Sequence, residues 1–263
     1  MVLEASELIL LNNEPIENAK KISAIVPAVE MMLDGDGWDD TENRWNEIAK
    51  ELADLHLHFT VHPPAWDHNV AAGLFSLRKT ARTLNLSALE VAKIIGAKQI
   101  VFHTGYCDRG SNFSREIAQR HSKEALFELI DFAKPNGIRI AVENVAPPQN
   151  ALYTQEEFVH ILDGVDETAQ YLLDLGHAHM NHWDLPWVIH QISSRLCGLH
   201  IHDNNGSSDQ HLPIGCGTIE WEKVFAEMEL LHNDCHFVLE YAPGTSLDEL
   251  RKGVKLLTSR FQK

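Results

Sequence analysis

The sequence contains few cysteines, and their spacing forms no recognisable pair. Four are present, at positions 107, 197, 216 and 235. No two of them make a C-x-x-C motif, the spacing typical of zinc ribbons and thioredoxin-like redox sites. A chain of 263 residues is also too large to need disulfides to hold its core together. We therefore expect reduced thiols, as in the cytosol.

Long hydrophobic runs are also missing from the sequence. No stretch approaches the roughly 18 apolar residues that would indicate a membrane span. The first nine residues include Glu4 and Glu7 but no basic residue, whereas a secretory signal starts with basic residues and continues with an apolar run. We expect a cytoplasmic protein with no membrane partner.

Basic residues are in deficit. The chain has 22 lysines and arginines against 38 aspartates and glutamates, a net charge of −16. Proteins that bind nucleic acids usually present a basic face to the phosphates. The charge therefore argues against nucleic acid as a partner, without excluding a local basic patch. A cluster of bound metal ions would offset part of this negative charge.

What the sequence does contain is a regular alternation of short β-branched runs and longer amphipathic stretches. No internal repeat or change in composition interrupts it. The predicted strands are Leu8–Leu11, Ala28–Leu33, His56–Val61, Gln99–His103, Arg139–Glu143, Tyr171–Asp174, Leu199–His202 and Phe237–Glu240.

The amphipathic stretches follow the 3.6-residue period of a helix. Glycines at 96, 137 and 164 stand where helix C-caps would fall. The predicted helices are Ile16–Ile22, which is short and weak, Asn43–Leu55, Ser87–Ile95, Arg115–Ala133, Glu156–Leu162, Leu185–Ile192, Trp221–Leu231 and Ser246–Phe261.

This alternation predicts a parallel sheet covered by helices. At this length we expect a single α/β domain over residues 1–263, folded as a (β/α)8 TIM barrel. A doubly wound open sheet is the alternative. No G-x-G-x-x-G motif follows the first predicted strand, which weakens the case for a dinucleotide-binding fold.

Six consecutive predicted strands carry a side chain that can bind a first-row metal at or near their carboxyl ends. These residues are His62, His103, Glu143, Asp174, His200 and Glu240. In a barrel these ends converge on one mouth, where active sites lie. A single such residue is more often an ordinary polar residue, but six in succession are hard to explain by chance. The pattern predicts a divalent-metal site.

Two neighbouring segments extend this set. His177 follows Asp174 by three residues, and Asp209 and His211 lie in a loop after the seventh strand that can fold over the mouth. A solvated polar loop is the alternative interpretation of Asp209 and His211. Three histidines that share strands with ligand candidates are interpreted as barrel fillers or as hydrogen-bond donors to the ligands: His56, His58 and His202.

These residues resemble the xylose isomerase-like barrel superfamily, over most of the chain. The superfamily includes sugar-phosphate isomerases and epimerases, ketose 3-epimerases, inosose-handling enzymes and apurinic/apyrimidinic (AP) endonucleases of the endonuclease IV type. The motifs that carry the resemblance are VENVAP at 142–147, LDLGHAH at 173–179, HIHDNNG at 200–206, DQHLPIGCGTIEW at 209–221 and LEYAP at 239–243.

The resemblance implies two ligand sets. The four-ligand site of the isomerases would be formed by Glu143, Asp174, His200 and Glu240, with Glu143 and Glu240 as the catalytic acid and base. The endonuclease branch uses nine ligands for three zinc ions, and the nine matching positions are His62, His103, Glu143, Asp174, His177, His200, Asp209, His211 and Glu240. Many isomerases have arginine where His211 stands, and GCG at 215–217 replaces a common GEG.

The compact acidic chain, with no obvious basic and aromatic-rich loop, favours a metal-dependent sugar or sugar-phosphate isomerase or epimerase that transfers a proton through an enediolate. A zinc-dependent AP endonuclease or phosphodiesterase is the first alternative. The second is a dehydratase of a sugar or inositol derivative, which can use the same enediolate. A non-enzymatic carbohydrate- or metal-binding barrel is the remaining interpretation.

The expected cofactor is one to three divalent ions. Three carboxylates with one imidazole suit Mn²⁺, Mg²⁺ or Co²⁺, whereas five imidazoles shift the preference toward Zn²⁺. The expected partner is a small carbohydrate, with His179, Trp66 and Tyr106 as candidate contacts. A homodimer is consistent with the resemblance, because dimers are common among such enzymes.

Overall fold

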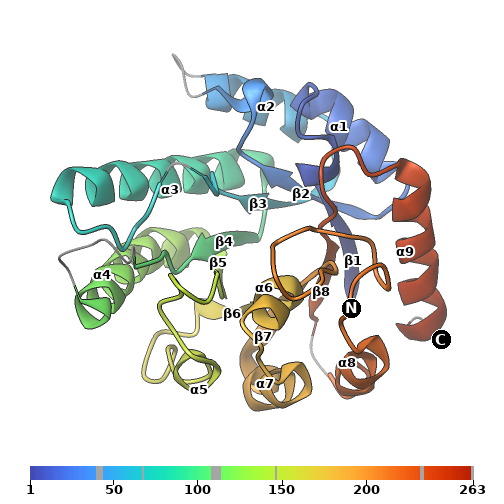
Figure 1. The fold of residues 1–263 in the computed structure, drawn as a ribbon. Coiled ribbons are helices and arrows are strands. Elements are labelled where there is room, and N and C mark those ends of the chain that lie inside the picture. The colour runs from blue at the N-terminus through green and yellow to red at the C-terminus, as the bar shows by residue number, and fades with distance from the viewer. Residues whose placement is uncertain (40–43, 67, 108–113, 146, 232–233, 262–263) are drawn as a thin grey trace.

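The chain folds into a closed barrel of eight parallel strands, which confirms the predicted TIM barrel (Figure 1). The computed structural model describes residues 1–39, 44–66, 68–107, 114–145, 147–231 and 234–261. Each strand pairs with its neighbour in sequence, and β1 pairs with β8 to close the barrel. The strands are β1 Val2–Ser6, β2 Ala28–Met32, β3 His58–His62, β4 Gln99–His103, β5 Arg139–Glu143, β6 Ala169–Asp174, β7 Leu196–Ile201 and β8 His236–Leu239.

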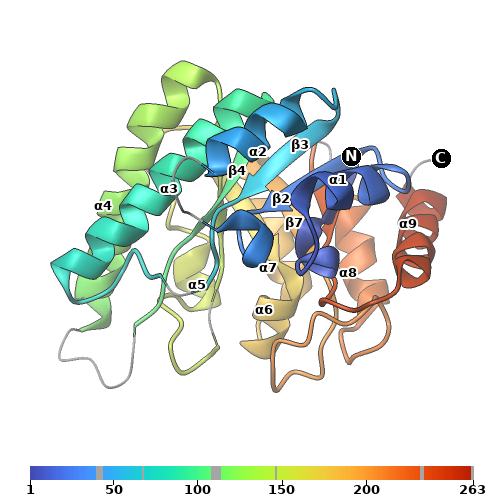
Figure 2. The same ribbon diagram turned by 90° about the horizontal axis from the view of Figure 1, so that it is seen from above.

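Helices surround the strands, and the loops that follow the strands gather at one end of the molecule (Figure 2). Among the described residues, no helix is both long and apolar enough to cross a membrane. The helices are α1 Pro15–Ser23, α2 Arg44–Ala53, α3 Phe75–Ile95, α4 Arg115–Ala133, α5 Gln155–Phe158, α6 Leu175–Met180, α7 Leu185–Ile192, α8 Trp221–Met228 and α9 Leu247–Phe261.

The first strand differs from the prediction. The apolar run Leu8–Leu11 lies in a 3-10 turn and its cap, whereas β1 is Val2–Ser6. β1 contains Glu4, which is 1% exposed. Because a charged residue stands at a buried position, the strand lacks the apolar pattern by which strands are predicted. Inside the barrel, Glu4 accepts a hydrogen bond from Thr60 and pairs with His236. These partners offset the cost of burying the carboxylate.

Most other elements match the prediction, and four match to the residue: β4, β5, α4 and α7. Helix α3 begins twelve residues before its predicted start at Ser87. Its N-cap Leu74 and its first-turn residues Phe75 and Leu77 are exposed, which breaks the amphipathic pattern. Helix α6 was not predicted. Its six residues are too few to show a helical period.

Candidate metal centre

Strand period brings the predicted ligands to the barrel mouth. A small buried cluster inside the barrel contains Val101 of β4, Ala141 of β5 and Leu172 of β6. Side chains two residues apart point to the same side of a strand. His103, Glu143 and Asp174 each stand two residues after one of these positions, so their side chains also point inward, one layer closer to the carboxyl end. The local alternation of the strands therefore explains why these residues face the mouth.

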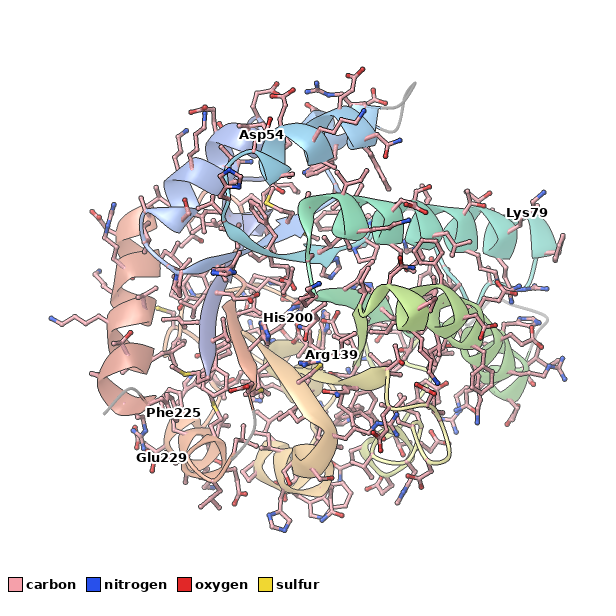
Figure 3. The ribbon with its side chains drawn as sticks, turned by 180° about the vertical axis from the view of Figure 1, so that it is seen from behind. Asp54, Lys79, Arg139, His200, Phe225 and Glu229 are labelled. Carbon is pink, nitrogen blue, oxygen red and sulfur yellow. The ribbon has the colours of Figure 1, made fainter. Side chains whose placement is uncertain are left out.

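The inward orientation of His200 depends on an irregularity in strand pairing. The pairing between β6 and β7 contains an irregularity, where Tyr171 aligns with Leu196 but Leu172 aligns with Gly198. The extra residue in β7 shifts its alternation by one position. As a result His200 aligns with Asp174 and is fully buried. Figure 3 shows the His200 side chain close to the centre of the ring of strands.

The inner ligand candidates Glu143, Asp174, His200 and Glu240 lie within reach of one another. The Nδ1 atom of His200 lies 3.0 Å from a Glu143 oxygen, 3.4 Å from a Glu240 oxygen and 3.8 Å from an Asp174 oxygen. These carboxylates are between 0% and 3% exposed. One imidazole thus faces three buried carboxylates through a single nitrogen.

Two outer groups flank this inner set. His62 Nε2 and His103 Nε2 are 3.0 Å apart, and His103 Nε2 lies 2.9 Å from a Glu143 oxygen. On the other flank, an Asp209 oxygen lies 3.1 Å from His177 Nε2 and 3.0 Å from His211 Nε2. In each of these groups of three, the candidate ligand atoms lie within 4.8 Å of one another. All nine positions predicted as ligands therefore converge on the mouth.

Backbone carbonyls fix the orientation of three of the outer imidazoles. The Nδ1 atoms of His62, His177 and His211 lie 2.7, 3.0 and 2.9 Å from the carbonyl oxygens of Pro63, Asn144 and Glu240. A neutral ring whose Nδ1–H donates to a carbonyl presents an unprotonated Nε2. In all three rings, Nε2 is the atom that meets the other members of its own outer group.

The loop that carries Asp209 and His211 is held down by Asp203. This carboxylate is fully buried and accepts hydrogen bonds from the backbone N–H groups of Gly215 and Ile219 and from the Trp221 indole. Asp203 also pairs with Leu212 through both backbone groups. The loop after β7 therefore returns over the mouth, as the sequence predicted.

The charges of the cluster suit a bound cation. Burial alone would lower the pKa of His62, but the hydrogen bond with Glu143 and the charges of nearby glutamates raise it to about 9. Burial likewise opposes the charge of Glu143, yet His200 and His103 hold its pKa well below the usual range. Without a metal, protonated imidazoles must balance these carboxylates. A divalent ion can replace those protons, so the donor set fits a metal.

Two buried residues of the centre, Glu30 and His202, were not predicted as ligands. Glu30 of β2 is fully buried, and its oxygens lie 3.2 and 3.3 Å from His200 Nε2. Its position within an apolar strand gave no motif to find it by. His202 lies 3.0 Å from an Asp174 oxygen and stacks on His211, which confirms the predicted contact with a ligand candidate.

The same interpretation was wrong for His56 and His58. Both are exposed, because β3 begins at His58 and these residues lie at the end of the barrel away from the mouth. Both residues stand an even number of positions before His62, which predicted inward-facing side chains. This alternation does not bury them, because the strand only begins at His58.

A cavity of about 550 Å³ opens above the cluster. Trp66 and Tyr106, two of the three predicted substrate contacts, are among the residues that line it, together with His68 and Met180. His179 is not among the described lining residues. It follows His177 by two positions on α6, about 200° around the helix, and its Nε2 lies 2.8 Å from the Thr218 hydroxyl instead.

Comparison with known sequences places the chain among related barrels. The family model described as the xylose isomerase-like TIM barrel matches residues 18–260. An uncharacterized protein of Methanocaldococcus jannaschii is 29% identical over 197 residues, which make up 74% of this chain and 76% of that protein. A probable endonuclease 4 of Acholeplasma laidlawii is 32% identical over 149 residues, 49% of each chain.

Solved structures share the fold. A D-tagatose 3-epimerase-like protein superposes with a TM-score of 0.84 at 23% identity, covering 100% of this chain and 97% of that one. The IolI protein, crystallised with a zinc atom, superposes with a TM-score of 0.72 at 17% identity, covering 99% and 96%. At these identities the likeness shows a shared barrel fold and nothing further.

Proposed function

Because the chain belongs to the xylose isomerase-like TIM barrel family, we propose that it is a divalent-metal-dependent isomerase or epimerase of sugars. The observation that carries this proposal is the placement of Glu143 and Glu240 at a cavity of about 550 Å³, a size that suits a small molecule. The proposed chemistry is proton transfer at a carbon next to a carbonyl group. The epimerase-like structural neighbour supports the same class of substrate.

The metal would be held by the inner ligands Glu143, Asp174, His200 and Glu240, with the two outer groups available to further ions. Oxygen-rich inner ligands suit Mn²⁺, Mg²⁺ or Co²⁺, and the imidazoles of the outer groups favour Zn²⁺. A bound ion would supply Lewis-acid polarisation of the substrate oxygens. The zinc-bound structural neighbour supports this cofactor class.

The two glutamates are suited to act as base and acid. Glu143 ends β5 and Glu240 follows β8, three strands further around a barrel of eight. Both line the cavity, and both reach the same nitrogen of His200. Carboxylates that approach a bound sugar from different strands can remove a proton on one side and return it on another.

The permanently charged side chains of the cavity favour an uncharged substrate. Among the described residues that line it, none is lysine or arginine, while Glu143, Asp209 and Glu240 are acidic. A site for a phosphodiester backbone would normally offer cationic side chains to the phosphates. Trp66 and Met180 supply apolar surface instead, which suits the C–H faces of a sugar.

A proton-exchange assay tests this function. Protein loaded with Mn²⁺ or Co²⁺ should catalyse exchange of a carbon-bound hydrogen with deuterium oxide for at least one sugar in a panel of ketoses and aldoses, read by NMR. Glu143→Gln and Glu240→Gln should each slow exchange by about 100- to 10,000-fold. Glu4→Gln alters a buried glutamate that does not line the cavity, and it should retain activity.

A metal-dependent phosphodiesterase is the second candidate, because all nine ligand positions of the endonuclease pattern converge in the structure. The partial match to a probable endonuclease 4 supports it. The same metal-loaded protein should therefore be given duplex DNA with an abasic site at low salt. Nicking without any sugar exchange would replace the isomerase proposal with this one.

A further inference from the structure

Glu30 is a buried carboxylate directly behind a metal-ligand candidate. It lies in the middle of β2, aligned with Ser6 of β1 and Thr60 of β3, and it is fully buried. It is not among the described residues that line the cavity. A buried charge costs free energy unless it has a compensating partner.

That partner is His200, which reaches Glu30 across the barrel. The two carboxylate oxygens lie 3.2 and 3.3 Å from Nε2 of the imidazole. The opposite nitrogen, Nδ1, is the one that lies 3.0 Å from Glu143 and 3.4 Å from Glu240. The imidazole ring therefore lies between Glu30, which faces Nε2, and the ligand candidates, which face Nδ1.

A neutral imidazole carries one N–H, and its hydrogen-bond partner decides which nitrogen holds it. A carboxylate can only accept a hydrogen bond. Facing Glu30, Nε2 holds the hydrogen, and Nδ1 is left with its lone pair toward Glu143, Asp174 and Glu240. Carboxylate contacts of this kind orient metal-bound histidines and make the bound nitrogen more basic.

We propose that Glu30 is the positioning residue of the metal centre: it fixes the Nε2–H tautomer of His200 and aims Nδ1 at the metal. The inference rests on the metal site of the proposed function and is independent of which substrate the site takes. It gives a role to a buried residue that is not among the described residues lining the cavity.

Metal affinity of the full chain tests this role. Wild type, Glu30→Gln and Glu30→Leu are titrated with Co²⁺ and with Zn²⁺, using the cobalt absorption spectrum and competition with a chromophoric chelator. Glu30→Leu removes the acceptor and should weaken binding by about 10- to 100-fold. Glu30→Gln keeps an acceptor oxygen but loses the charge, so its affinity should fall between the two.

Glu4→Gln is the matched control. Glu4 is also a barrel glutamate, 1% exposed and paired with a histidine, His236, but it stands one layer below Glu30 in the strand register, and its partners His236 and Thr60 are not ligand candidates. It should bind Co²⁺ as tightly as wild type. Thermal unfolding of the metal-free proteins shows whether each variant remains folded.

A second readout reports the tautomer itself. In Zn²⁺-loaded protein labelled with ¹⁵N at histidine, the His200 signals should show Nε2 protonated and Nδ1 bound to metal, and Glu30→Leu should broaden or change this pattern. A folded Glu30→Leu protein with wild-type affinity and an unchanged tautomer would refute the role. Wild-type protein that binds no metal would refute both this role and the metal centre. Tight metal binding without sugar exchange would refute only the proposed reaction.

Discussion

At the scale of single residues, Glu7 illustrates how burial changes the pKa of a carboxylate that is not among the candidate ligands. It is 1% exposed, and it accepts hydrogen bonds from the Asn18 amide, the Met32 backbone N–H and the Trp38 indole. Burial raises its pKa to about 7, although these three donors act in the opposite direction. The folded state therefore favours the protonated form more than the unfolded state does.

This shift gives a pH dependence with a definite sign. Below about pH 4.5 the group is protonated in both states, and as the pH rises to 7 the folded protein loses up to about 3 kcal/mol of stability. Glu7→Gln removes this titration. The difference in unfolding free energy between wild type and Glu7→Gln, measured by urea unfolding from pH 4.5 to 8, should therefore decline with pH.

The exposed Glu51 on α2 offers a control for this measurement. Glu51→Gln should follow the wild-type curve at every pH. A constant difference between wild type and Glu7→Gln would mean that Glu7 ionises equally easily in both states, contrary to its buried setting.

At the scale of elements, the joint between β6 and α6 is tightly packed against the ligand cluster. Asp174 ends β6 and caps α6 by accepting a hydrogen bond from the His177 backbone N–H. Two positions later, Gly176 leaves no room for a side chain, because a Cβ there would overlap the ring of His202. That ring is fully buried between Asp174 and His211, so it has little freedom to move.

Gly176→Ala should consequently destabilise the protein by about 1–3 kcal/mol, the usual cost of overpacking, and weaken metal binding by displacing His202 from Asp174. Urea unfolding and cobalt titration measure the two effects. Gly198→Ala in β7 is the control, since a Cβ there meets Leu172 at an ordinary 3.4 Å. Equal behaviour of the two variants would contradict the close packing at Gly176.

At the scale of the whole molecule, the candidate metal centre joins most strands of the barrel. Ligand candidates stand at the ends of β3 to β6, within β7 and just after β8, and two more come from the loop after β7. An ion bound to several strands stabilises only the folded state, because the unfolded chain does not hold these groups together. Metal binding and global stability are therefore linked.

Chelation should lower the melting temperature, by the equivalent of about 4 kcal/mol if the metal had been present at 1,000 times its dissociation constant. His62 and His211 have pKa values raised to about 9 in the metal-free protein. Their protonation stabilises the metal-free fold below about pH 6.5, and this contribution is lost as the pH rises through 9.

Protons and metal compete for the same nitrogens, so the stabilisation by Mn²⁺ should grow from pH 6 to 8.5. Melting curves with and without metal measure this trend. Metal analysis of the same samples counts the ions: one per chain agrees with the inner ligands alone, and three agree with the full set of nine. A melting temperature that does not respond to metal at any pH would contradict the proposed centre.

The sequence by itself determined the barrel and the nine candidate ligand positions, since strand alternation and the repeated placement of His, Asp and Glu near strand ends are local patterns. Tertiary structure decided the features that these local patterns do not predict. The irregular pairing of β6 with β7 turns His200 inward, and the buried glutamates Glu4 and Glu30 find their partners only across the barrel. Such contacts join residues far apart in the chain, so no spacing in the sequence records them.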